Sequence, residues 1–338
     1  MGGDKAPESV LQGAEIAIER HPGIRYLLFG DEARLKVLLA RMPKLAQHAE
    51  VRHAPSVISP EEKPSQALRR GRDSSMRYAI NAVAQDEAVG VVSGGNTGAL
   101  MAISKFVLHT LPGIDRPAIA GVFPTMHGEA VMLDLGANID CDANNLMQFA
   151  VMGAAFARTV LGLPNPTVGL LNVGEEELKG NDTVRLAAQI LRSTPLPLNF
   201  VGFIEGDDIT KGTTDVIVTD GFTGNIALKT AEGSAKLCFQ FLRQAFNQSL
   251  LAKIGYLFAR GELARMRQRL NPQNYNGGVF LGLNGISVKS HGSADAHSFA
   301  AAIGVAADMA KDRLKQRIIE DVRRFGSFSE PPTQAAAQ

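Results

Sequence analysis

Five glycine-rich segments carry the residue types that bind an inorganic anion. Glycine lets the backbone approach a ligand closely, and free amides at the start of a helix attract phosphate. One such turn usually only starts a helix, but ligands of a parallel sheet bind beyond the carboxyl ends of its strands. We therefore expect all five segments to meet at one edge of a sheet. They are residues 2–5 (GGDK), 93–98 (SGGNTG), 134–138 (DLGAN), 172–180 (NVGEEELKG) and 220–225 (DGFTGN).

Two lysines follow apolar runs near these segments. Lys179 comes after three glutamates, 175–177, and the alternative there is a solvated charge run at a helix start. Lys289 and His291 precede the last predicted helix and bring a cation and a titratable ring, with a structural turn as the alternative. Cys141 stands between two aspartates that raise the pKa of its thiol, so we expect a buried side chain rather than a nucleophile.

Standard cofactor and hydrolase motifs do not occur. No turn fits Gly-x-Gly-x-x-Gly, the spacing from Gly224 to Lys229 does not fit a P-loop, and there is no Gly-x-Ser-x-Gly elbow. The histidines and cysteines show no metal-binding spacing. We therefore expect no nucleotide cofactor, no metal and no serine triad.

The composition is typical of a globular protein of a reducing compartment. Of 338 residues, 45% are hydrophobic and 20% are charged, and 35 Lys and Arg against 34 Asp and Glu leave a net charge of +1. A net charge this small gives no overall electrostatic attraction for nucleic acid. Two cysteines argue against a disulfide framework, and the first residues show no apolar signal segment. We expect a cytosolic location.

Short apolar runs alternate with segments of helical period, which predicts a three-layer α/β/α sandwich with a largely parallel, Rossmann-like sheet. We expect one large domain over residues 1–325 and a disordered tail over 326–338. Strands are predicted at 25–30, 51–54, 88–93, 118–124, 129–135, 167–173, 198–206, 215–219 and 279–288. Helices are predicted at 6–20, 33–39, 64–85, 97–108, 143–161, 182–193, 224–248 and 294–325.

Residues 249–271 form an amphipathic, basic stretch within a predicted helical protrusion of about residues 240–276. Five positive side chains against Glu262 leave an excess of four: Lys253, Arg260, Arg265, Arg267 and Arg269. We expect one helix, or a pair broken at Gly261, that touches an anionic membrane surface. The alternative is a dimer-interface helix with a solvated basic face. The apolar positions at helical spacing are Leu250, Leu251, Ile254, Leu257 and Phe258.

Taken together, these motifs resemble a known family, the bacterial acyl-acyl carrier protein:phosphate acyltransferases of phospholipid synthesis. The resemblance runs from residue 1 to about residue 325, and the joint order of its short motifs is specific. In that family a short apolar strand precedes the Met-Gly-Gly-Asp turn, whereas this sequence begins at the turn. We therefore expect a gap in the sheet, costing on the order of several kcal/mol unless it is filled or tolerated. The motifs are residues 1–4 with 6–7, 93–99, 133–138, 172–176 with 179–180, 219–225 and 289–292.

The resemblance implies a homodimeric cytosolic enzyme without an organic cofactor. It would transfer a long-chain acyl group from acyl-acyl carrier protein to inorganic phosphate, and the acyl phosphate would supply a membrane glycerol-3-phosphate acyltransferase. A membrane-touching helix and a peripheral position at the inner face of the cell membrane fit that role. Docking of the acidic carrier protein would use a local basic patch, either Arg260, Arg265, Arg267 and Arg269 or Arg69, Arg70 and Arg72.

Phosphate is itself a nucleophile and a thiolate leaves readily, so positioning and charge stabilisation suffice without a covalent intermediate. We expect Lys179 and the amides of residues 94–96 and 221–224 to bind phosphate, and Asn225 or His291 to stabilise the oxyanion or the thiolate. Asp4, Asp134 and Asp220 would orient loops rather than act as bases. The full set of expected phosphate and substrate contacts is Gly3, Asp4, Gly94, Gly95, Asn96, Asp134, Asn138, Asn172, Gly174, Glu175, Asp220, Gly221, Thr223, Gly224 and Lys289.

Two rival functions stay open from the sequence. One is a short-chain phosphate acyltransferase using coenzyme A, or a metal-dependent dehydrogenase of a related α/β type, although the sequence shows neither a nicotinamide site nor an acidic metal cluster. The other is a non-catalytic membrane-docking scaffold, which only the amphipathic stretch supports. Formation of acyl phosphate from acyl carrier protein or coenzyme A thioesters separates these functions.

Overall fold

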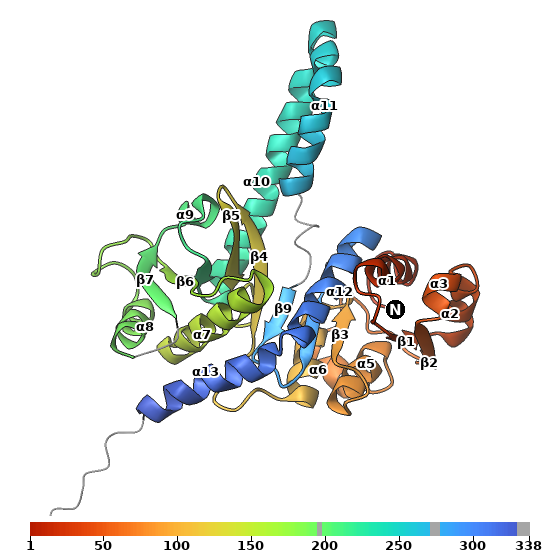
Figure 1. Cartoon of the computed structure of the whole chain (residues 1–338), viewed down its shortest axis with the longest axis horizontal. Helices are drawn as coiled ribbons and strands as arrows, with labels where there is room; N and C mark the ends of the chain where they lie inside the picture. Colours follow the sequence, from red (N-terminus) through yellow and green to blue (C-terminus); the bar gives the residue numbers. More distant parts are fainter. Residues whose placement is uncertain (195–197, 271–277, 330–338) are drawn as a thin grey trace, which may run out of the picture.

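The computed structural model describes residues 1–194, 198–270 and 278–329, and within this part of the chain helices flank a central sheet (Figure 1). The strands are β1 (Tyr26–Gly30), β2 (Ala49–His53), β3 (Gly90–Ser93), β4 (Ala118–Thr125), β5 (Gly128–Leu133), β6 (Thr167–Leu171), β7 (Asn199–Ile204), β8 (Val216–Val218), β9 (Gly278–Leu281) and β10 (Ile286–Lys289). The first two pair with each other, and the other eight form one sheet in the order β3-β10-β9-β4-β5-β8-β6-β7.

Helices cover both faces of this sheet, as a three-layer sandwich requires. Alternate residues of the strands pack in opposite directions: Val279 and Leu281 join one apolar core with α7, and Phe280 joins another with α5 and α6. The helices are α1 (Glu8–Arg20), α2 (Glu32–Leu39), α3 (Pro43–Ala46), α4 (Pro64–Arg70), α5 (Ser75–Ala84), α6 (Thr97–Leu108), α7 (Ala143–Val160), α8 (Asp182–Ser193), α9 (Asp208–Lys211), α10 (Gly221–Asn247), α11 (Leu250–Leu270), α12 (Ala296–Lys311) and α13 (Leu314–Ser329). The predicted α/β sandwich with a mixed, mostly parallel sheet is confirmed.

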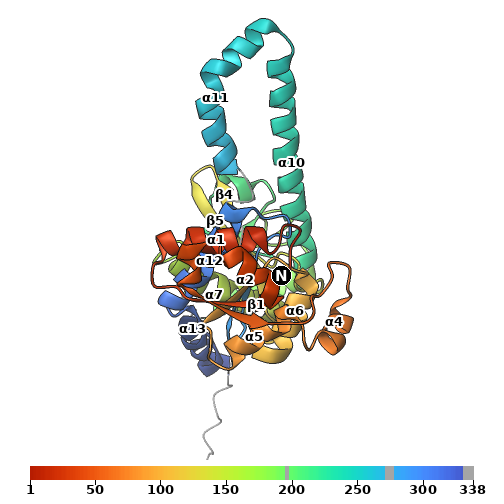
Figure 2. The same cartoon turned by 90° about the vertical axis from the view of Figure 1, so that its right-hand side faces the viewer.

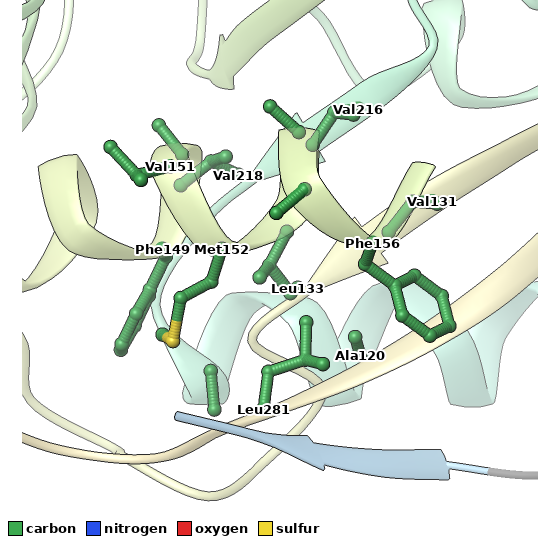
Figure 3. Close-up of a cluster of buried hydrophobic side chains, with 14 of the residues drawn as sticks. Ala120, Val131, Leu133, Phe149, Val151, Met152, Phe156, Val216, Val218 and Leu281 are labelled. Carbon is green, nitrogen blue, oxygen red and sulfur yellow. The ribbon is translucent and has the colours of Figure 1, made fainter. Parts of the chain in front are cut away.

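Helix α7 anchors the strands from which two of the glycine-rich turns emerge. Its side chains Phe149, Met152 and Phe156 are buried over β5, β8 and β9 (Figure 3). Leu133 and Val218, the last residues of β5 and β8, are fully buried in this cluster. Because close-packed side chains leave little room for movement, the turns after β5 and β8 start from fixed positions.

Strand direction changes three times across the sheet, so the five glycine-rich segments do not all follow strands that run the same way, as the prediction of one common edge assumed. Strand β3 is parallel to β10, but β9 is antiparallel to β10 and to β4, and β4 is antiparallel to β5. Strands β5, β8, β6 and β7 are parallel to one another. The carboxyl ends of β3 and β10 therefore point one way and those of β5, β8 and β6 point the other way. The strand register nevertheless runs from Val288 through Val279 and Ala120 to Leu133, the last residue of β5, so β10 and β5 end at the same level of the sheet.

Several element boundaries also differ from the prediction. The apolar run 279–288 is a hairpin, β9 and β10, that turns at Gly282 with φ +87°. Segment 64–85 is divided into α4 and α5 after Gly71, and segment 294–325 is divided into α12 and α13 at Arg313, with φ +53°. Helices α3 and α9 were not predicted. Helix α13 continues to Ser329, so 326–329 are helical, and the rest of the predicted tail lies outside the described residues.

A cavity of about 670 Å³ lies between β1 and β3. Residues 26–29 and 90–93 line its two sides, and α1, α5 and α12 contribute mainly apolar side chains. Both strands end beside the first residues of the chain: a Cβ on Gly30 would overlap Met1, and a Cβ on Gly2 would lie 2.6 Å from Gly95 Cα. Two strand edges thus face each other across this space.

Helices α10 and α11 form a hairpin that projects from the sandwich (Figures 1 and 2). The two helices touch near the turn, where the rings of Phe246 and Tyr256 lie 5.5 Å apart. Helix α11 is continuous through Gly261, so the predicted alternative of a pair broken there is wrong. The expected protrusion is present over α10 and α11, and its last predicted residues, 271–276, lie outside the described residues.

Candidate active site

Three glycine-rich turns meet at the edge where β3 and β10 end. We call residues 2–4, 94–95 and 289–292 the Lys289 cluster. The Asp4 amide donates to the Gly292 carbonyl at 2.8 Å, and the Ser290 amide donates to the Ser93 carbonyl at 2.9 Å. A Cβ on Gly94 would lie 3.1 Å from the Gly2 carbonyl oxygen. The absence of side chains on these glycines is what lets the three turns touch.

Lys289 extends into the middle of this cluster. Its ammonium donates to the Ser290 carbonyl and lies 3.5 Å from the Gly94 carbonyl oxygen. Burial lowers the pKa of Lys289 to about 8, and the negative charge of Asp4 opposes this shift. The site therefore holds a half-buried cation whose hydrogen-bond partners are neutral carbonyls.

His291 lies beside Lys289 in the same turn. Its Nδ1 accepts from the Ser293 amide at 3.2 Å, which assigns the proton of the neutral ring to Nε2. Burial and the neighbouring Lys289 charge lower the pKa of His291, so the ring is neutral at pH 7. Lys229 and Glu232 on α10 also act on His291 electrostatically, which places this part of α10 near the Lys289 cluster.

Two further turns meet after β5 and β8, whose carboxyl ends point the other way. We call residues 134–138 and 220–225 the Asp134 cluster. The Gly221 amide donates to the Asn138 carbonyl at 2.7 Å, and a Cβ on Gly224 would overlap the Asp134 carbonyl. The Asn225 side chain is exposed and lies next to Gly136. Asp220 caps α10 by accepting from the Thr223 amide at 2.8 Å.

Asp134 is fully buried and organises this second cluster. Its Oδ1 accepts from the amides of Ile119, Gly136 and Ala137, and its Oδ2 accepts from the amide and side chain of Asn138. Burial raises the pKa of Asp134, and most of these hydrogen bonds oppose the rise. The side chain thus holds the loop, in keeping with the orienting role expected for it, rather than facing solvent.

Lys179 lies in the turn after β6, on the same edge as the Asp134 cluster. Asn172 shapes this turn by donating from Nδ2 to the carbonyls of Gly174 and Lys179. Lys179 and Glu175 are exposed. No hydrogen bond or ion pair within residues 1–194, 198–270 and 278–329 joins the Lys179 ammonium to either glycine cluster.

Several expected substrate contacts use their side chains to shape turns. Asn96 Nδ2 donates to the carbonyls of Ser59, Pro60 and Glu62, and its Oδ1 caps α6. Asn138 Nδ2 donates to the Pro117 carbonyl. These amide side chains are already engaged within the protein, and what their turns offer a ligand is mainly backbone.

Helix α10 links the two clusters, a role that the sequence analysis missed. It begins in the Asp134 cluster at Gly221, carries Asn225 next to Gly136, and brings Lys229 and Glu232 near His291. Positions 225, 229 and 232 follow the i, i+4, i+7 spacing of one helix face. This spacing, counted from the Asp220 cap, is visible in the sequence and could have indicated that α10 joins the two clusters.

The described residues contain neither a metal-binding cluster nor a membrane-spanning helix. Among the described residues, no group of three or more His, Cys, Asp and Glu side chains is placed to hold a metal ion. Within the same part of the chain, no helix has the length and apolar character needed to cross a bilayer. On α11, Leu251 and Phe258 are 81% and 84% exposed, and Leu250, Ile254 and Leu257 are also exposed, so these five apolar side chains face solvent.

Comparison with known proteins identifies the family. The family model described as "Fatty acid synthesis protein" matches residues 1–317. The phosphate acyltransferase of Paramagnetospirillum magneticum is 57% identical over 337 residues, which cover 100% of this chain and 96% of the relative. That of Rhodospirillum centenum is 58% identical over 343 residues, covering 100% and 97%.

A solved phosphotransacetylase from Streptococcus pyogenes shares the fold, with a TM-score of 0.60 and 18% identity over 90% of this chain and 92% of the other. That likeness concerns the fold alone, whereas the curated relatives match over nearly their full lengths at more than half of all positions. The chain therefore belongs to the fatty acid synthesis protein family and is a phosphate acyltransferase of lipid synthesis.

Proposed function

We propose that the enzyme transfers a long-chain acyl group from acyl-acyl carrier protein to inorganic phosphate at the Lys289 cluster. The observation that carries this proposal is the Lys289 ammonium, which is held by carbonyls among three touching glycine turns. The cation lies next to closely packed glycine backbone, and this combination suits a tetrahedral oxyanion. His291 lies beside Lys289 with a neutral ring that donates from Nε2.

The reaction needs positioning more than a special nucleophile. A phosphate oxygen attacks the thioester carbonyl carbon, and the C–S bond then breaks. Lys289 neutralises the phosphate charge, and His291 Nε2 stabilises the oxyanion of the tetrahedral intermediate. Holding both reactants in line and placing charge in a half-buried site are the two large contributions available to such a site.

Roles for Lys179 and Asn225 stay predictions. Both follow strands, β6 and β8, that point the opposite way from β3 and β10, and Asn225 lies one helical turn before Lys229 of α10, which acts on His291. Comparison of K179M with K289M separates the two locations: with Lys289 at the reaction centre, K289M loses acyl phosphate formation by orders of magnitude. If Lys179 binds the phosphate, K179M shows that loss and K289M does not.

The remaining partners are also proposals. The exposed apolar side chains of α11, with Arg260 and Arg265 beside them, favour contact with an anionic membrane surface or with the acidic carrier protein. The same unpartnered face favours a homodimer in which two hairpins pack together. A cytosolic enzyme that touches the inner face of the cell membrane would pass its acyl phosphate to a membrane glycerol-3-phosphate acyltransferase.

The direct test is product formation from defined donors. Purified enzyme with phosphate and either palmitoyl-acyl carrier protein or acetyl-coenzyme A is quenched with hydroxylamine, which traps acyl phosphate as a hydroxamate. We expect product from the long-chain carrier thioester and little from the short-chain coenzyme A ester. Preference for acetyl-coenzyme A would replace the proposal with the short-chain alternative, and no product from either donor would overturn it.

A further inference from the structure

The neutral surroundings of the Lys289 ammonium suggest a second task for this group. An ammonium that is paired with a carboxylate is held by that charge, but here the acceptors are the carbonyls of Gly94 and Ser290. An ammonium has three N–H donors, and these carbonyls account for two. Within the described part of the chain, Lys289 forms no ion pair, and Asp4 acts on it only through its charge at longer range.

We propose that Lys289 is also the general acid that protonates the departing thiolate. The inference rests on the proposed function, because it assigns a proton transfer within that reaction. When the C–S bond breaks, its electron pair goes to sulfur, and the third N–H of Lys289 gives its proton to that sulfur to form the thiol. The lysine amine then takes a proton from the phosphoryl oxygen of the new acyl phosphate, which restores the ammonium.

The pKa of the proton donor matches that of the thiol that it would form. Burial brings the pKa of Lys289 to about 8, close to that of an alkyl thiol, about 8.5. General acids work best when their pKa lies near the working pH. The charged and titratable groups around this lysine are Asp4 and His291 from its own cluster and, beyond His291, Lys229 and Glu232 from α10.

Two substitutions separate proton donation from charge. K289R keeps the positive charge but cannot release a proton, because a guanidinium stays protonated at any working pH. K289M removes both. Two donors complete the design: a long-chain acyl-acyl carrier protein, whose alkyl thiolate needs a proton, and the same acyl group on thiophenol, whose thiolate leaves without one.

We expect K289R to lower kcat on the carrier thioester by about 10²–10⁴-fold, the usual contribution of general acid catalysis. The KM for phosphate should stay within about threefold of wild type because the charge is kept, and the aryl thioester should restore most of the lost rate. With wild type and the carrier thioester, kcat should fall as the pH rises through about 8, where the ammonium loses its proton, whereas K289R should lack this decline.

Equal losses of K289R on the alkyl and aryl donors would overturn the assignment and leave Lys289 as a binding group only. Wild-type kcat for K289R on the carrier thioester would overturn it too. K289M, which should raise the KM for phosphate and also recover partly on the aryl donor, keeps the test valid if K289R misfolds. The proposed function fails separately, in the wild-type reaction, if no acyl phosphate forms from the carrier thioester.

Discussion

Substitution of Asp134 by Asn tests how much one buried carboxylate contributes to the geometry at the start of α10. The amide keeps the shape of the carboxylate, and its oxygen can still accept from Ile119, Gly136 and Ala137. Its NH₂ group then faces the two donors of Asn138, at 2.7 and 2.9 Å in the native arrangement. Two hydrogen bonds become donor–donor contacts.

The expected cost follows from these contacts. A buried donor that loses its acceptor costs about 1–3 kcal/mol, and the neutral amide regains part of this by avoiding a buried charge. We therefore expect D134N to lower the free energy of unfolding by about 3 kcal/mol. For a chain of this size, that is a fall of roughly 4 °C in Tm.

Thermal and urea unfolding, followed by circular dichroism, measure this loss. Asp140 provides a matched control, since it is an exposed aspartate in the segment that follows the same loop. D140N should stay within about 0.5 kcal/mol of wild type, as is usual for surface substitutions. A D134N protein as stable as D140N would refute the reasoning, because the five hydrogen bonds to Asp134 would then contribute nothing measurable.

Two further predictions concern other parts of the chain. G224A should unfold at least about 3 kcal/mol more easily because its Cβ overlaps the Asp134 carbonyl, whereas G233A on the same helix has open space and should gain about 0.5–1 kcal/mol; urea titration compares them. The double substitution L251S and F258S should reduce sedimentation with anionic vesicles without changing Tm. V89S, at an exposed position away from the hairpin, should change neither sedimentation nor Tm.

Local patterns in the sequence predicted the elements well because each pattern reports on its own segment. The apolar runs of β3, β6 and β8 and the period of α7 and α8 agree with the structure. The hairpin β9 and β10 was missed since Gly282 interrupts a run that is apolar on both sides. Periodicity alone does not distinguish one strand from two.

The direction of the strands was the larger error, and it concerned the site. Predicting one common edge assumed that parallel pairing continued throughout, but β4 and β5 are joined by a tight turn between Thr125 and Gly128, which forces them antiparallel. So short a connection between two predicted strands was a usable signal. The contact of residues 2–4 with 94–95 and 289–292 could not be predicted from local signals of this kind. Contacts between segments so far apart in sequence depend on the order of all the strands in the sheet.

The position of bound inorganic phosphate tests the central claim most directly. In crystals of the enzyme soaked with phosphate, the ion should lie within hydrogen-bond distance of Lys289 Nζ and the amides of residues 94–95. Phosphate bound instead between Lys179 and the first turn of α10, with none at the Lys289 cluster, would contradict the account.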